Sequence, residues 1–522
     1  MLKRHKDFLR PLVANLRVTL AGTAGADGTW QRGDLDRELE RLGIAPDGTA
    51  IPIDALRNPG PNERRARIGA DAYLAAAVNG LKGTEAEKQR RSARGEFVER
   101  AAYTWINRLL ALRTMEARGL IDETLRANPD YEGISEALFV LRQTDPARCA
   151  QPDGGWWAVI EDACTAQAVS LPGLFDLSDP AAALRPSTAA LLRCVTLIGG
   201  APAGFTLTEA DAAFADPDAI GWAYQFYQEA AKARVYEKLG SGGKAASRAE
   251  IAAATQLFTE PYMVQWLLQN SLGRSYHEAY PDSKLPESWA YYIRQRPEGQ
   301  TAPESPRPLE ALDLIDPCCG SGHFLREAFD MFAAMYRERH PELSAAEVAD
   351  RILTRHLHGI DLDPRAAQLT ALVLYLRAWE FVRDDARRQR RPLSSVAYRP
   401  ATLNIATTPS GLSAGALQRH LRRHPEDRVM KPLLEGVFAA LEQADAQYRS
   451  TVINAFQNVT DALRSLQSDA REVETARKSE DAAKRSLDIV RMQLKYGQVS
   501  QIAVFTAQRI YFSASLLRAL VH

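Results

Sequence analysis

Asp316 and Asp361 are the residues of this chain best placed for binding chemistry, because each follows a short apolar run. A glycine turn with Gly320 and Gly322 comes soon after Asp316. Glycines let a ligand approach the backbone closely, and the free amides at the start of a following helix favour a polar or anionic group. An acidic side chain at the end of a second strand can accept hydrogen bonds from both hydroxyls of a ribose. The pattern therefore predicts a nucleotide-type binding edge.

The flanking segments predict the elements that would position these two aspartates. Residues 312–315 form a short apolar run typical of a strand, and apolar residues recur at helical spacing over 323–335. In a second step, a strand ends at Asp361 and Pro364 opens a long helix. A helical segment over 341–355 would explain why the aspartates lie further apart than the usual spacing of about 20 residues. An α/β turn that binds no ligand is the alternative interpretation.

The composition bounds the class of protein. The 65 basic and 65 acidic residues cancel, so any contact with nucleic acid must rest on local patches. Five cysteines without C-x-x-C spacing indicate a reducing compartment and argue against a zinc site, so no metal ligands are assigned. The sequence shows no signal peptide and no apolar run of about 18 residues, so we expect a cytoplasmic protein without membrane contact. The adjacent Cys318 and Cys319 could suggest redox chemistry, but two small residues packed in a tight loop are the simpler interpretation.

A length of 522 residues predicts about three domains. Changes in composition and in the spacing of apolar residues divide the chain into four parts. They are a helical N-terminal region (1–240), a capping segment with a loop (245–310), an α/β region (311–444) and a helical hairpin (446–522). The clearest element of the first region spans 97–120, where apolar residues recur at helical spacing. Residues 384–425 are basic and read as irregular. The expected fold class is α/β with a large α-helical N-terminal region.

The C-terminal segment has a pattern of its own. Apolar residues recur there at alternating spacings of four and three, which is the a/d seam of a coiled coil. The seam comprises Val452, Phe456, Val459, Leu463, Leu466, Ala470 and Val473, and it resumes at Ala483, Leu487, Val490 and Leu494. Tyr496-Gly497 then breaks the seam, and a second helix is expected from about Ser500 onward. The pattern predicts an antiparallel coiled-coil hairpin with a glycine turn.

The glycine turn resembles a known cofactor motif. Residues 316–324 have the form D-P-x-x-G-S-G-x-F, which looks like the S-adenosylmethionine motif of DNA adenine methyltransferases. Further matches lie in residues 102–116, 221–227, 255–273 and 358–364. Over about residues 1–444 the chain resembles the large adenine-specific methyltransferases of BREX phage-defence systems, the PglX-like group.

This resemblance implies S-adenosyl-L-methionine as the cofactor and a partial doubly wound (Rossmann-like) methyltransferase domain. The cofactor-binding residues that it implies are Phe258, Thr259, Pro261, Asp316, Pro317, Gly320, Ser321, Gly322, Phe324 and Asp361. Asp316 would face the amino end of the methionine moiety. In the family, the Leu-Phe-Thr-x-Pro segment that includes Phe258 packs over the cofactor. DNA and other phage-defence proteins are the implied partners.

The catalytic motif of that family does not occur in the sequence. An N-P-P-[YF] loop normally holds the amine of a flipped-out adenine and stacks on the base. The partial matches at Asn58-Pro59 and Asn128-Pro129 precede the cofactor motif, and residues 403–406 offer no acidic contact to the base. The family's target-recognition domain is also expected to be absent. We therefore assign no catalytic residues and expect weak cofactor binding without methyl transfer.

The C-terminal segment resembles a second family. Residues 447–448, 455–463 and 496–500 are similar to the periplasmic helical hairpin of TolC-like outer-membrane efflux factors, which packs in a trimeric tunnel. The two resemblances together imply a truncated methyltransferase sequence joined near Ala444 to an efflux-protein fragment. A generic coiled-coil tail is the alternative, and self-association through residues 447–522 is expected from either.

Other functions stay open at this point. The chain could be an interaction protein that binds partner helices through its hairpin, or half of a split enzyme whose catalytic loop lies on a second chain. Basic clusters at residues 88–94, 387–391 and 419–424 could contact DNA phosphates, but their acidic neighbours suit solvated faces equally well.

Overall fold

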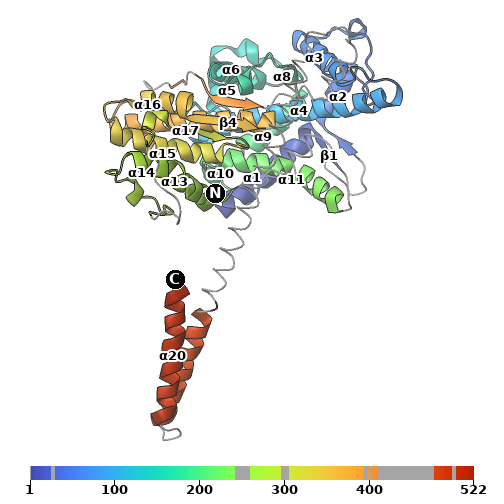
Figure 1. Cartoon of the computed structure of the whole chain (residues 1–522). Helices are drawn as coiled ribbons and strands as arrows, with labels where there is room; N and C mark the ends of the chain where they lie inside the picture. The colour runs from blue at the N-terminus through green and yellow to red at the C-terminus, as the bar shows by residue number, and fades with distance from the viewer. Residues whose placement is uncertain are drawn as a thin grey trace, which may run out of the picture. The chain divides into compact units, whose positions relative to one another are not determined.

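The chain divides into two compact units, Met1–Thr408 and Pro409–His522. The computed structural model, drawn in Figure 1, describes residues 2–24, 30–240, 259–294, 305–361, 363–392, 398–399, 402–407, 475, 477–495 and 501–521. Each unit is described below by itself.

The N-terminal part of the first unit is mainly helical, which confirms the prediction for residues 1–240. Its α-helices are α1 (Lys3–Leu20), α2 (Asp34–Arg41), α3 (Pro61–Ala77), α4 (Gly83–Ala117), α5 (Glu136–Thr144), α6 (Trp156–Ala168), α7 (Pro172–Phe175), α8 (Pro180–Ala183), α9 (Thr188–Gly199), α10 (Leu207–Ala215) and α11 (Ala219–Gly240). A short antiparallel pair, β1 (Gly22–Ala24) and β2 (Trp30–Arg32), was not predicted.

Helix α4 forms the centre of this helical region. The predicted helix over 97–120 is confirmed, and it begins earlier, at Gly83. Nearly every side chain from Ala101 to Glu116 is buried, so polar groups on α4 need partners inside the protein. Trp105 donates its indole N–H to the carbonyl of Leu184 at 2.9 Å, and Arg108 donates to the carbonyl of Leu174 at 2.7 Å. These bonds tie α4 to the segments packed around it.

The α/β part contains a parallel sheet in the order β3-β4-β5. Its strands are β3 (Leu314–Asp316), β4 (Leu357–Asp361) and β5 (Asn404–Thr407). The first two confirm the predicted steps. The expectation of irregular structure over 384–425 was wrong at β5, because a four-residue strand is too short to show an alternating pattern and obtains its hydrogen bonds from β4.

Several helices around the sheet begin at a proline or at a capping residue. They are α13 (Pro261–Asn270), α14 (Leu272–Ala279), α15 (His323–Arg339), α16 (Ala345–Arg351), the π-helical turn Ile352–His356 and α17 (Pro364–Arg388). Pro261 and Pro364 occupy the first turns of α13 and α17, where proline costs no hydrogen bond. Ser344 and Glu347 form a capping box at α16. The predicted long helix from Pro364 is confirmed, and it continues through residues 384–388, which had been expected to be irregular.

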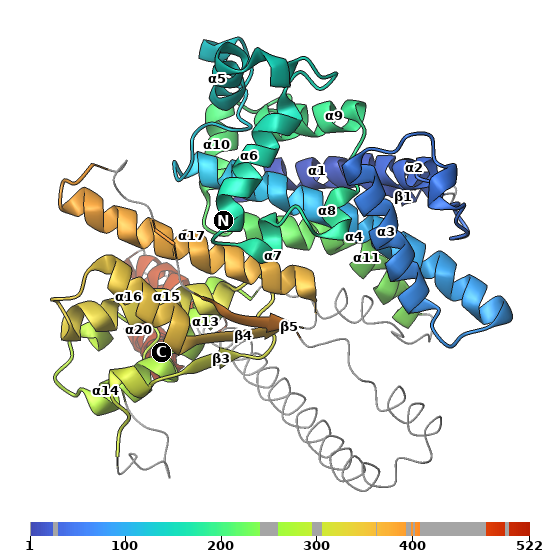
Figure 2. The same cartoon turned by 90° about the horizontal axis from the view of Figure 1, so that it is seen from above.

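Helix α17 belongs to two hydrophobic cores. One face, with Leu369, Leu372 and Leu376, packs into the core of the N-terminal helices. The other face, with Leu374 and Phe381, packs with α15 into the core above the sheet. Figure 2 shows α17 running between the sheet and the N-terminal helices. The helical region and the sheet are therefore joined by one shared element.

The second unit contains two helices among its described residues, over 477–495 and at α20 (Gln501–Val521). Leu487 on the first helix is buried with Val504 and Ala507 of α20. The predicted heptad seam over 452–473 lies outside the described residues. None of the helices in the part of the chain that the structure describes is long and apolar enough to cross a membrane.

Candidate functional site

The loop between β3 and α15 has the backbone of a ligand-binding turn. Gly320 and Gly322 have φ angles of 54° and 81°, in the left-handed region that favours glycine. Gly322 is the N-cap of α15, and no side chain caps the helix there. Uncapped amides at a helix start carry a partial positive charge, so they favour polar or anionic ligand groups.

The two glycines are needed for different reasons. A Cβ atom on Gly320 would meet only the carbonyl oxygen of Cys318, at 4.0 Å. A Cβ atom on Gly322 would lie 3.1 Å from both Cα and Cγ2 of Thr370 on α17. Gly322 therefore permits close packing of the loop on α17, whereas Gly320 leaves open space beside its backbone.

Asp316 and Asp361 are the last residues of adjacent parallel strands, so the structure brings them to the same edge of the sheet. Asp316 accepts the amide of Cys318 at 3.1 Å, and Asp361 accepts the amide of Gly320 at 2.8 Å. Burial raises the pKa of Asp316, and the nearby Asp361 carboxylate adds to the rise. Two acidic groups beside one glycine turn suit a ligand with hydroxyl and cationic groups.

The adjacent cysteines lie in different surroundings. Cys319 is buried and Cys318 is exposed, and neither forms a disulfide. Burial raises the pKa of Cys319 to about 12, so its thiol is protonated and unreactive at neutral pH. Tight packing of Cys319 is confirmed, and Cys318 instead faces solvent. Within the described ranges, no group of three or more His, Cys, Asp or Glu residues could hold a metal ion.

The remaining predicted residues differ in position and in exposure. Pro317 is exposed, and Ser321 and Phe324 are half-buried, with Phe324 packed against the core above the sheet. Thr259 is half-buried and Pro261 is exposed at the start of α13, a helix that contacts α15. Phe258 lies outside the described residues. The structure thus brings 316–324 and Asp361 together.

A buried polar cluster next to the loop was missed by the sequence reasoning. Tyr224 of α11 donates its hydroxyl to Asp363 at 2.9 Å, and the Arg365 guanidinium pairs with the same carboxylate at 2.8 Å. The Arg365 guanidinium also lies over the ring of Tyr103, 5.0 Å from its centroid. The only local signal was the Asp363-Pro364 pair, which is typical of a helix start.

A second polar contact joins the helical region to the start of α15. The Nδ1 atom of His323 lies 3.7 Å from Asp218, and Arg326 lies 3.3 Å from the same carboxylate. Burial lowers the pKa of His323 to about 4, although the charge of Asp218 acts in the opposite direction. His323 is therefore neutral at neutral pH, directly after the glycine turn.

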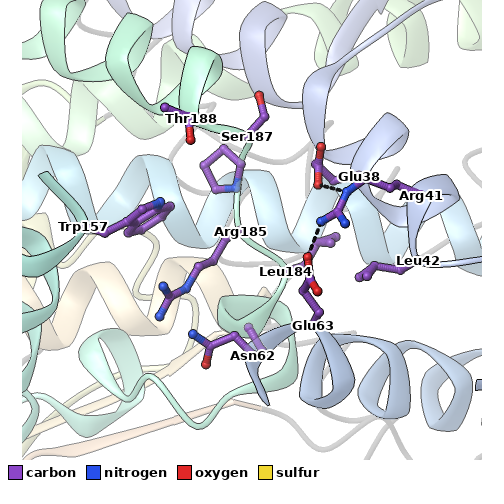
Figure 3. A pocket seen from close by; sticks show the side chains of 12 residues that line it. Glu38, Arg41, Leu42, Asn62, Glu63, Trp157, Leu184, Arg185, Ser187 and Thr188 are labelled. Carbon is purple, nitrogen blue, oxygen red and sulfur yellow. Dashed lines mark hydrogen bonds and ion pairs between the residues drawn. The ribbon is translucent and has the colours of Figure 1, made fainter. Parts of the chain in front are cut away.

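A cavity of about 430 Å³ lies in the N-terminal helical region (Figure 3). Arg41, on its wall, is neutralised by Glu38 at 2.8 Å and by Glu63 at 2.6 Å. Arg185, on the opposite side, is paired with Glu161 and lies over the Trp157 ring. Because both guanidinium groups already have carboxylate partners, this cavity is a weaker candidate for a binding site than the glycine turn.

Three arginines of the basic clusters at 88–94 and 387–391 pair with acidic residues. Arg387 and Arg388 contact Asp384 and Asp385 at 3.1 and 3.3 Å. Arg94 is buried and pairs with Asp36. The cluster at 419–424 lies outside the described residues. Contact of these clusters with DNA stays a prediction.

Comparison with known proteins shows that the chain is homologous to two adenine-specific methyltransferases. It is 33% identical over 354 residues to the adenine-specific methyltransferase BrxX of Escherichia coli O9:H4 (strain HS), covering 63% of this chain and 28% of that protein. It is 26% identical over 418 residues to the adenine-specific methyltransferase PglX of Lacticaseibacillus casei (strain Zhang), covering 71% of this chain and 32% of that protein. The chain thus spans about a third or less of the length of these relatives.

The C-terminal segment matches a different family. Residues 433–521 match the family model described as outer membrane efflux protein. The two resemblances predicted from the sequence are therefore both confirmed.

Proposed function

We propose that the first unit binds S-adenosyl-L-methionine at the edge of the sheet where β3 and β4 end. The observation that carries this proposal is the placement of Asp316 and Asp361 at one edge of the sheet, beside a glycine turn that opens α15 without a side-chain cap. Homology to two adenine-specific methyltransferases supports the same ligand. The three parallel strands would then be part of a doubly wound, Rossmann-like domain.

The residues at this edge fit the chemical groups of the cofactor. S-adenosylmethionine supplies an activated methyl group on a cationic sulfonium. Asp361 would accept the ribose hydroxyls, and Asp316 would face the ammonium end of the methionine moiety. The open space beside Gly320 would admit the ligand. Thr259 and Pro261, at the start of α13, would contribute further contacts to it.

Isothermal titration of the purified chain with S-adenosylmethionine and with S-adenosylhomocysteine tests this proposal. We expect binding that Asp361→Asn weakens about tenfold, because a charge-assisted hydrogen bond contributes roughly 1.5 kcal/mol or more. Asp313→Asn is the matched control, since Asp313 is an exposed carboxylate just before β3. Absence of binding by the unmodified chain, or equal affinities for the two variants, would contradict the assignment.

We propose further that this chain alone does not methylate DNA. The 522 residues contain no N-P-P-[YF] sequence to hold and stack a flipped adenine. DNA remains the partner that the homology suggests. Adenine methylation in plasmid DNA incubated with the purified chain and S-adenosylmethionine would refute this proposal. Methylation that appears only after addition of a second chain with the motif would support a split enzyme.

A second candidate function is self-association through an antiparallel coiled-coil hairpin at the C-terminus. Phe512 and Leu516, one turn apart on α20, are each 64% exposed, and Ile502 is 75% exposed. Apolar side chains at this spacing form a face that a partner helix can cover. The efflux-family match over 433–521 favours the same interpretation.

Light scattering on the whole chain tests self-association. We expect an oligomer that the double variant Phe512→Asp, Leu516→Asp converts to a monomer. Ile68→Asp on α3 is the control, because Ile68 is 61% exposed but lies in the first unit. A monomeric unmodified chain would rule this function out.

A further inference from the structure

Three segments distant in the sequence meet beside the glycine turn. Tyr103 comes from α4, Tyr224 from α11, and Asp363 with Arg365 from the start of α17. The Tyr103 and Tyr224 rings lie edge to face, with centroids 6.1 Å apart. Asp363 is only 4% exposed, so its carboxylate depends on protein groups for stabilisation.

Asp363 has a full set of such partners. Its carboxylate accepts the Tyr224 hydroxyl at 2.9 Å, the Arg365 guanidinium at 2.8 Å and the Arg365 amide at 3.0 Å. Burial opposes ionisation of Asp363, but the hydrogen bonds from Arg365 outweigh it and lower the pKa. The side chain is therefore an anion fixed in one orientation between the helical region and α17.

Two hydrogen bonds connect the backbone of Asp363, the residue that carries this carboxylate, to the glycine turn. The backbone amide of Asp363 donates to one oxygen of Asp361 at 2.7 Å. The other oxygen of Asp361 accepts the amide of Gly320 at 2.8 Å. The position of Tyr224 is thus linked, through Asp363 and Asp361, to the backbone of the turn.

We propose that Tyr224 and Asp363 are positioning residues, through which the N-terminal helical region orients the Asp361 carboxylate toward the ribose of the bound cofactor. This inference rests on the proposed cofactor site. It assigns a role in ligand binding to the helical region, which supplies no residue of the glycine turn itself. Loss of the Tyr224 hydroxyl would release one of the bonds that hold Asp363, and with it the orientation of Asp361.

Tyr227 offers a matched control on the same helix. Its ring also packs on Tyr103, with centroids 4.8 Å apart, and its hydroxyl also donates to a carboxylate, that of Glu99, at 2.7 Å. Tyr227→Phe and Tyr224→Phe therefore remove the same kind of hydrogen bond from neighbouring buried sites. Only Tyr224 is linked to Asp361 by the hydrogen bonds described above.

Two measurements on the whole chain test the inference. The first is titration with S-adenosylhomocysteine and with its 2′-deoxy analogue. We expect Tyr224→Phe to bind S-adenosylhomocysteine about five- to tenfold more weakly than the unmodified chain does, and to prefer it less strongly over the analogue. Tyr227→Phe should keep both values close to those of the unmodified chain. Without ligand, hydrogen exchange of the Gly320 amide should speed up in Tyr224→Phe alone, since that amide is bonded to Asp361.

The outcomes separate this inference from the function on which it rests. If the unmodified chain binds neither ligand, the proposed cofactor site is wrong and the positioning role falls with it. If the unmodified chain binds and the two tyrosine variants behave alike in affinity, in preference and in exchange, the cofactor site stands and the positioning role is overturned. An equal loss of melting temperature in both variants, with a selective loss of affinity in Tyr224→Phe, supports the role.

Discussion

His323 shows how a single half-buried side chain can contribute to the acid sensitivity of this protein. Burial holds its pKa at about 4 in the folded chain, whereas an unfolded histidine titrates near its ordinary value of about 6.5. Between these two values the unfolded chain binds a proton that the folded chain does not. The free energy of unfolding must therefore fall as the pH falls through this window. Buried His356, whose pKa burial also lowers, acts in the same direction.

At this residue scale we predict that His323→Asn reduces the loss of stability on acidification. The measurement is the urea midpoint of unfolding at about pH 7 and at about pH 5. Most of the pH range in which the folded and unfolded chains differ in protonation of His323 lies between these two values. His340→Asn is the control, since His340 lies near the surface beside Glu310 at 2.7 Å. If His323→Asn loses as much stability as the unmodified chain over this interval, another group dominates the acid response.

At the scale of elements, the turn between β3 and α15 contains two glycines with different roles. Gly322 packs against α17, and Gly320 lies beside open space. Gly322→Ala would place a methyl group 3.1 Å from Thr370 in a left-handed backbone conformation. We expect it to destabilise the fold by about 2 kcal/mol or more, since the left-handed conformation alone costs roughly 1–2 kcal/mol. Gly320→Ala should cost about 1 kcal/mol and chiefly weaken cofactor binding.

Thermal unfolding and cofactor titration of both variants check this prediction. The expected pattern is a large loss of melting temperature for Gly322→Ala and a small one for Gly320→Ala. A folded Gly320→Ala variant that binds the cofactor normally would show that the ligand does not approach this backbone.

The elements that were predicted correctly are those whose signals are local. Pro364 and the apolar stripe after it predicted α17. Asp316 and Asp361, each after a short apolar run, predicted where β3 and β4 end. The strand β5 was missed because its partner β4 lies far back in the chain. The bond from Tyr224 to Asp363 joins residues 139 positions apart, so no local pattern could indicate it.

At the scale of the whole molecule, the two cores that share α17 should unfold together. We predict that Leu376→Ala, at a fully buried position, destabilises the first unit by about 2–5 kcal/mol. Because α17 packs in both cores, hydrogen exchange should increase together in peptides from α4 and from α15.

Leu487→Ala in the second unit is the control for this experiment. Leu487 is buried with Val504 and Ala507 of α20 in the core of the second unit, so its loss should leave α4 and α15 protected. Faster exchange in α4 with unchanged exchange in α15, in the Leu376→Ala variant, would show that the helical region and the sheet unfold independently.

The sharing of α17 also has a consequence for synthesis on the ribosome. The core of the N-terminal helices contains Leu369, Leu372 and Leu376, which are made long after α11 ends at Gly240. Domains of many proteins fold in order of synthesis, the N-terminal one first. Here the nascent helical region must wait with part of its apolar surface uncovered until α17 has left the exit tunnel, so chaperones that bind nascent chains should meet this protein during that interval.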